Sequence, residues 1–175
     1  EGFFRMGDAA SFVDRAHPEE GLAFAGRVAE EFKLQTGVFV RVGSLRVTLL
    51  DATAPLLQDV VITGADQSYV GALAWLNIAA CRELTGLHDA DVRTLAAHPL
   101  LRQQLIEKLR AHNTRHPSSS LRLRRLCLLQ APPSIEQGET NDKGYINQRK
   151  VLDNRRDRVE ALYADRPPAD VLVIN

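Results

Sequence analysis

The alternation of apolar and polar positions divides the chain into a strand-rich first third and a mixed remainder. Short strands are predicted where apolar or β-branched runs lie between turn residues, at 2–5, 11–13, 22–25 and 38–42. A short helix is predicted over 44–51, with Ser44 as its N-cap. Two further apolar runs, 59–63 and 69–76, are separated by a Gly-Ala-Asp turn and predict a β-hairpin.

The middle of the chain has helical periodicity. Helices are predicted over 78–84, 89–97 and 100–112. Asp89 is the predicted cap of the second helix, and Pro99 fits the first position of the third. Leu101, Leu105 and Leu109 recur every four residues and predict the buried face of the third helix.

The last third returns to a strand and then to a helix. Alternating Leu and Arg predict a strand over 121–129, and a Pro-rich loop follows at 131–143. A charged helix is predicted over 147–164, with an edge strand at 171–174. This mixture favours an α+β fold, in which flanking helices pack on a small mixed β-sheet.

Charge and composition argue against several classes of binding partner. Lys plus Arg and Asp plus Glu each number 22, so the net charge is zero and gives no electrostatic case for nucleic acid or an acidic membrane. Cys81, Cys127 and the five histidines lack the spacing of metal ligands, and we predict no metal site. No apolar run approaches the roughly 20 residues that span a bilayer, and no signal peptide is evident. We therefore expect a soluble cytoplasmic protein.

The residues taken alone form no catalytic constellation. The serine run 118–120 lacks the strand-to-helix context of a nucleophile and reads as a turn. The Glu-Glu pairs at 19–20 and 30–31 are typical of solvent-exposed faces. The chain opens at Glu1 inside an apolar run, without Met, and we expect a piece of a longer protein. On this basis alone the prediction is a soluble α+β domain.

Five segments, in order, nevertheless resemble one family. They are GFFRMGD at 2–8, GRVAEEFK at 26–33, QTG at 35–37, the hairpin region 55–76 and ETNDKGYINQR at 139–149. The set resembles the C-terminal part of adenylate-forming (AMP-binding) acyl-CoA synthetases. The last segment is similar to the terminal lysine motif of feruloyl-CoA synthases. The resemblance implies that 1–26 end a large N-terminal domain at its ribose-binding strands, that 27–164 form the mobile C-terminal domain, and that 165–175 are a tail.

The resemblance also implies nucleotide-binding and hinge residues. Asp8 would accept both ribose hydroxyls of ATP or AMP, which suits an ionised acceptor. Arg27 would contact the nucleotide near its ribose and phosphate. Glu30 would be the hinge about which the small domain turns.

Three residues are implied in the chemistry itself. Lys143 would stabilise the charge that gathers when a carboxylate attacks the α-phosphate of ATP. Lys33 and Gly37 would face the pantetheine arm of CoA in a second conformation, with Gly37 letting backbone approach closely. Met6 and Phe39 stand where the family has Thr and Arg.

The implied activity is that of an acid–thiol ligase using ATP, which carries Mg²⁺, and CoA. The acid would be feruloyl or another hydroxycinnamic acid, with a fatty acid as the alternative. Two other readings stay open: an adenylation domain that loads a carrier protein, and a non-catalytic interaction module of the same fold. The sequence has no Ser/Thr/Gly-rich phosphate loop and no large acyl-binding domain. We therefore expect the chain alone to be inactive and to bind no cofactor.

Overall fold

The computed structural model describes residues 8–27 and 30–175, and its strands form three sheets. The first two are antiparallel pairs: β1 (Asp8–Phe12) with β2 (Leu22–Arg27), and β3 (Phe32–Lys33) with β4 (Phe39–Val40). The third contains β5 (Leu57–Thr63), β6 (Val70–Leu76), β7 (Leu123–Leu128) and β8 (Val171–Val173), in that order. A predicted strand at 2–5 lies outside the described residues.

The four-stranded sheet is mixed. β6 pairs antiparallel with β5 and parallel with β7, and β8 closes the other edge antiparallel to β7. Every residue of β6 is buried, which accounts for its unbroken apolar sequence. The predicted hairpin of β5 and β6 and the predicted edge strand β8 are both confirmed.

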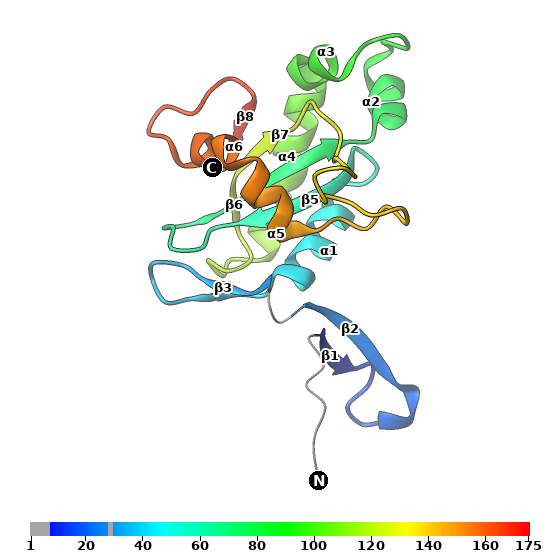
Figure 1. Cartoon of the computed structure of the whole chain (residues 1–175), viewed down its shortest axis with the longest axis vertical. Coiled ribbons are helices and arrows are strands. Elements are labelled where there is room, and N and C mark those ends of the chain that lie inside the picture. Colours follow the sequence, from blue (N-terminus) through cyan, green and yellow to red (C-terminus); the bar gives the residue numbers. More distant parts are fainter. Residues whose placement is uncertain (1–7, 28–29) are drawn as a thin grey trace.

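Helices cover both faces of this sheet (Figure 1). One face carries α1 (Val42–Thr53), α2 (Ile78–Thr85), α3 (Val92–Ala97) and α4 (Pro99–Arg115). The other face carries α5 (Gln148–Asn154) and α6 (Arg156–Tyr163). Leu105 of α4 and Ile62 of β5 lie in the first core, while Leu73, Trp75 and Leu162 lie in the second. The predicted α+β fold, a small mixed sheet with flanking helices, is confirmed.

Three predicted helix boundaries were wrong. α1 begins at the buried Val42 and has Arg41 at its N-cap position, so Ser44 lies inside the helix and is not its cap. α3 is capped by Asp91, whose carboxylate accepts from the Thr94 amide at 2.8 Å, and not by Asp89. The helix predicted over 147–164 breaks at Arg155, which separates α5 from α6.

The outer edge of β5 is closed by side chains. The Val60 amide donates to Asp59 Oδ1 at 2.7 Å, and Arg46 of α1 holds that carboxylate through bonds of 2.9 and 2.6 Å. The Ile62 amide donates to Oε1 of the buried Gln148 at 3.2 Å. These two amides are therefore not available to pair with a further strand. The second contact also fixes the start of α5 against the sheet.

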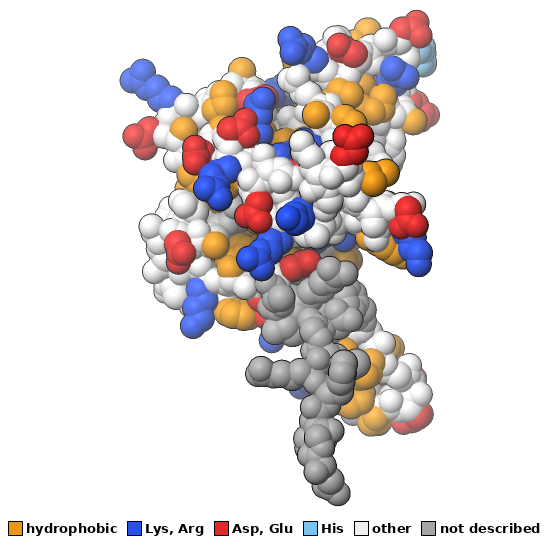
Figure 2. Space-filling view, in the orientation of Figure 1, with side chains coloured by type: hydrophobic (Ala, Val, Ile, Leu, Met, Phe, Trp, Pro, Cys, Tyr) orange, Lys and Arg blue, Asp and Glu red, His pale blue; other side chains and the backbone are white. Residues whose placement is uncertain are grey.

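The surface mixes charges of both signs. On the face drawn in Figure 2, acidic and basic side chains are interspersed over the body of the molecule. Among residues 8–27 and 30–175, no helix is sufficiently long and apolar to cross a bilayer.

Candidate functional site

The residue predicted to carry the chemistry, Lys143, lies on a loop between β7 and α5. We call residues 139–147 the lysine loop. At its base the Asn147 amide donates to the Glu139 carbonyl at 2.8 Å, and Thr140 forms a bridge with Ile146. Lys143 lies midway between the two ends and is exposed. The loop therefore presents one cation to solvent from a closed base.

The tip of the lysine loop is shaped by the carboxamide of Asn141. Its Oδ1 accepts from the amides of Lys143 and Tyr145, both at 3.0 Å. Its carbonyl accepts from the Gly144 amide at 2.9 Å. Gly144 has φ +78°, a conformation that favours glycine. The Gly that follows Lys143 in the motif thus serves the turn.

Below the tip, the loop is anchored by a buried ion pair. The Glu139 side chain is 1% exposed and accepts from Arg155 Nε at 2.9 Å and Nη2 at 2.7 Å. The Ser134 amide donates to Glu139 Oε2 at 2.9 Å. Arg155 also donates to the carbonyls of Ala131 and Pro132, at 2.9 and 2.8 Å. One guanidinium therefore ties together the carboxylate and the preceding Pro-rich segment.

Trp75 connects this anchor to the central strand β6. The Arg155 guanidinium carbon lies 5.2 Å from the centroid of the Trp75 ring, within the range of a cation–π contact. The indole N–H donates to the Ala131 carbonyl at 2.9 Å. The base of the lysine loop is thereby fixed to the most buried strand of the sheet.

The ion pair makes the stability of the domain depend on pH. The Arg155 guanidinium, acting against the burial of the carboxyl group, holds the pKa of Glu139 below its usual range. Because the folded pKa lies below the unfolded value of about 4.3, the pair stabilises fully above that pH and progressively less as pH falls through the folded pKa. We expect urea titrations to show a falling free energy of unfolding below about pH 4.3. Glu139→Gln should remove this part of the fall, and parallel pH profiles would contradict the assignment.

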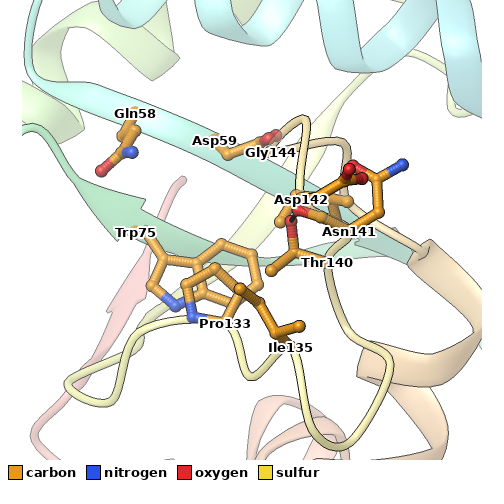
Figure 3. Close-up of a pocket in the computed structure, with 10 residues that line it drawn as sticks. Gln58, Asp59, Trp75, Pro133, Ile135, Thr140, Asn141, Asp142 and Gly144 are labelled. Carbon is orange, nitrogen blue, oxygen red and sulfur yellow. Dashed lines mark hydrogen bonds between the residues drawn. The ribbon is translucent and has the colours of Figure 1, made fainter.

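A hollow of about 300 Å³ opens beside the lysine loop (Figure 3). Trp75 forms part of its wall, with Pro133 and Ile135 from the Pro-rich segment. β5 contributes Gln58 and Asp59, and the lysine loop contributes Thr140, Asn141, Asp142, Gly144 and Ile146. The wall is thus apolar on one side and polar on the other. Within the described ranges, no group of three or more His, Cys, Asp or Glu side chains could hold a metal ion.

The two residues predicted to meet CoA share the β3–β4 hairpin. Lys33 is exposed and its carbonyl accepts from the Asp66 amide at 3.1 Å. The Gly37 amide donates to the Leu34 carbonyl at 2.8 Å, and its φ is +79°. A Cβ atom at Gly37 would meet nothing within 4 Å, so the space above it is open. In Figure 1 this hairpin and the lysine loop extend on opposite sides of the view.

The remaining predicted residues lie near the start of the chain. Asp8 and Arg27 are register partners in the β1–β2 pair, which places their backbones opposite each other. Glu30 is partly buried and, with Glu31, lines a hollow shared with Arg149 and Asp153 of α5. The structure therefore pairs Asp8 with Arg27. It places Lys33 and Gly37 in one hairpin, where Lys33 pairs with Phe39, and it carries Lys143 on a separate segment.

The anchor could not be predicted from the sequence. The local pattern predicts Arg155 in the middle of one charged helix and Trp75 in a strand of the hairpin. No local spacing links these positions to Glu139, because their contact depends on the packing of α5 against the sheet. The one sequence feature that points to the anchor is Glu139 beside a Pro-rich segment. Proline interrupts regular backbone pairing, so carbonyls in such a segment need donors from elsewhere.

The comparisons bear on this site. A family model described as the AMP-binding enzyme C-terminal domain matches residues 47–167. No curated protein matches the chain. Two similar solved structures come from the carboxylic acid reductase of Segniliparus rugosus. The A domain, in complex with AMP and a co-purified carboxylic acid, is 22% identical over 93% of this chain and 23% of that one, with a TM-score of 0.68. The A-PCP didomain, in complex with AMP, is 22% identical over 90% and 20%, with a TM-score of 0.64.

A third similar structure is the anthranilate CoA ligase AuaEII in complex with anthranoyl-AMP. It is 19% identical over 89% of this chain and 25% of that one, with a TM-score of 0.54. At these identities the likeness concerns the fold. The chain spans a quarter or less of the length of each of these structures.

Proposed function

The chain belongs to the AMP-binding enzyme C-terminal domain family, and on that premise we propose that it is the mobile domain of an ATP-dependent acid–CoA ligase. The family places it among adenylate-forming enzymes of the acid-ligase type. The observation that carries the finer proposal is Lys143, an exposed cation at the tip of a loop with an anchored base. Such a loop can be delivered to a reacting centre and withdrawn from it.

Lys143 would act in the first half-reaction. A carboxylate oxygen of the acid attacks the α-phosphorus of ATP, the bond to pyrophosphate breaks, and acyl-AMP forms. Negative charge builds on the phosphate oxygens during this step. A lysine ammonium is a compact charge that can lie between carboxylate and phosphate oxygens. Mg²⁺ would arrive with ATP, bound to its phosphates.

The β3–β4 hairpin would act in the second half-reaction. After rotation about the Glu30 segment, Lys33 and Gly37 would face the pantetheine arm of CoA. The CoA thiolate then attacks the acyl carbonyl, and AMP leaves. The hairpin and the lysine loop are separate segments that extend on opposite sides of the view in Figure 1, and this supports the alternation, because a rotation can bring one forward as it withdraws the other.

The nucleotide would be held at the start of the chain. Asp8 would accept from the two ribose hydroxyls, and Arg27 would donate to the nucleotide. Their register pairing in β1 and β2 supports a shared role. In this proposal residues 1–26 belong with the large domain, 27–164 form the mobile unit, and 165–175 are a tail.

The acid is proposed to be a hydroxycinnamate such as ferulate, because the lysine motif is similar to that of feruloyl-CoA synthases; a fatty acid is the alternative within the same class. A second candidate function is the loading of a carrier protein. The fold similarity to the A-PCP didomain of a carboxylic acid reductase favours that candidate. The two functions share the first half-reaction and differ in the thiol that accepts the acyl group.

The proposal is tested on the full-length protein. We expect pyrophosphate release that depends on an added acid and is highest with hydroxycinnamates in a panel that includes fatty acids. Acyl transfer is then measured with CoA and, separately, with a phosphopantetheinylated carrier domain. Transfer to the carrier alone would establish the second candidate. Absence of acid-dependent pyrophosphate release with every acid would favour the interaction module. The isolated chain should bind ATP weakly in calorimetry.

Gly37 provides a test of the second half-reaction. Gly37→Leu should slow thioester formation from supplied acyl-AMP by about tenfold or more while sparing pyrophosphate release, because the added side chain fills the open space above the turn. Gly37→Ala is the matched control, since it imposes the same left-handed strain with far less bulk. Equal losses in the two variants would assign the effect to backbone strain and remove Gly37 from the pantetheine path.

A further inference from the structure

The break between α5 and α6 places Arg155 in contact with Glu139, at the base of the lysine loop. We propose that Glu139 and Arg155 are positioning residues, which hold the lysine loop so that Lys143 reaches the reacting phosphate. This inference rests on the proposed function of Lys143. Neither residue touches substrate in this account, and both act through the backbone that carries Lys143.

The geometry of the pair favours orientation. Both Glu139 oxygens are engaged by one guanidinium, through contacts of 2.9 and 2.7 Å. Two parallel bonds between planar groups fix direction as well as distance. The Ser134 amide takes a further acceptor site of the same carboxylate. The carboxylate therefore has one orientation available to it.

The backbone of Glu139 is held as firmly as its side chain. Its amide donates to the Ser134 carbonyl at 2.8 Å, and its carbonyl accepts from the Asn147 amide at 2.8 Å. Asn147 also caps α5 through the Lys150 amide at 3.2 Å. One end of the lysine loop is thus fixed to the anchor and the other to a helix. Lys143 lies four residues from Glu139 and four from Asn147, so both fixed ends of the loop determine its position.

A purely stabilising role is a weaker explanation of the pair. Buried ion pairs contribute little net stability compared with apolar residues of the same volume, because the desolvation of both charges opposes their attraction. Moreover, the polar contacts of the Arg155 side chain go to Glu139, the first residue of the lysine loop, and to Ala131 and Pro132 in the segment that leads into it. The buried charge pair therefore fixes the position of one segment, the one that leads into and begins the lysine loop.

The test is a double-mutant cycle in the full-length protein. Glu139→Gln should lower kcat for acid-dependent pyrophosphate release by about 10- to 100-fold with little change in KM for ATP or the acid, because a misplacement of about 1 Å costs up to roughly 10²-fold. Thioester formation from supplied acyl-AMP should be unchanged. In a Lys143→Ala background, Glu139→Gln should cause no further loss, since it acts through Lys143.

Controls keep the test decisive. Asp170→Asn removes the carboxylate that pairs with Arg158 at 2.7 Å elsewhere in the domain, and both partial reactions should remain normal. Glu139→Asp keeps the charge but shortens the side chain, so it should retain more adenylation activity than Glu139→Gln. If Glu139→Gln does not fold, the cycle is run with Glu139→Asp and Arg155→Lys.

Three outcomes would overturn the inference. Equal slowing of both partial reactions, or a full additional loss in the Lys143→Ala background, would assign Glu139 a structural role. Unchanged pyrophosphate release in Glu139→Gln, where Lys143→Ala is impaired, would remove the positioning role alone. Unchanged release in Lys143→Ala itself would instead overturn the lysine assignment, and the inference with it.

Discussion

Lys143→Ala in the full-length protein should reduce acid-dependent pyrophosphate release by about 10²- to 10³-fold, the typical cost of removing one preorganised donor from a developing charge. Thioester formation from chemically supplied acyl-AMP should remain largely intact. The reason is that Lys143 meets charge only while phosphorus is attacked, and rotation withdraws the lysine loop before the thiol reacts. Both partial reactions are to be measured on one purified variant.

The matched control for this variant is Lys150→Ala. Lys150 is also an exposed lysine and lies in the first turn of α5, seven positions farther along the chain. Its loss removes the same charge from the same region and should leave both reactions unchanged. Melting temperatures are recorded for each variant, because a folding defect depresses both steps together. Equal slowing of the two steps at unchanged melting temperature would show that Lys143 is not the adenylation lysine.

The elements of the fold were largely predictable because local patterns and burial agree. β6 is a continuous apolar run and is buried on both faces, and Leu101, Leu105 and Leu109 recur at the spacing of one buried helix face. The errors arose where tertiary packing prevails over local signals. Val42 extends α1 beyond Ser44, and Arg155 breaks a helix whose sequence contains no Gly or Pro at that point.

The site was predictable only in part, for a related reason. Lys143 was singled out by a motif, and the structure shows how its neighbours Asn141 and Gly144 build the turn that carries it. The chemical roles of Lys143, Asp8, Arg27, Glu30, Lys33 and Gly37 stay predictions. The contact between Glu139 and Arg155 joins positions 16 residues apart in sequence across a loop and a helix. No periodicity encodes such a contact, because it follows from the packing of α5 on the sheet.

Asn113→Leu should lower the free energy of unfolding of the chain by about 2 to 6 kcal/mol, because it leaves two buried backbone groups without partners at about 1 to 3 kcal/mol each. The buried Asn113 side chain of α4 donates to the Leu123 carbonyl at 2.8 Å and accepts from the Leu123 amide at 2.9 Å. Leu123 is the first residue of β7. Urea unfolding at neutral pH measures the change. Gln103→Leu, at an exposed position of the same helix, should change stability by less than about 0.5 kcal/mol.

Asn113→Asp sharpens this prediction, because it keeps the shape and the acceptor but loses the donor. At neutral pH it buries a carboxylate against the Leu123 carbonyl and should destabilise the chain strongly. Burial would raise the folded pKa of the new carboxyl group above its unfolded value, so the native state would bind the additional proton, and the defect should shrink as pH falls. A defect that is the same at pH 7 and pH 5 would contradict this account of Asn113.

The two largest predicted effects concern different quantities: Asn113→Leu changes stability, and Lys143→Ala changes one partial reaction. Together they distinguish a folding defect from a chemical one. Asn113→Leu in the full-length protein should lower the melting temperature while leaving the ratio of the two partial reactions unchanged wherever the protein is folded. The reason is that Leu123, the partner of Asn113, begins β7 and belongs neither to the lysine loop nor to the β3–β4 hairpin. Lys143→Ala should change that ratio by about 10²-fold or more at an unchanged melting temperature. A change in the ratio with Asn113→Leu would mean that the start of β7 controls the lysine loop selectively, and that the anchor at Glu139 is insufficient to place it.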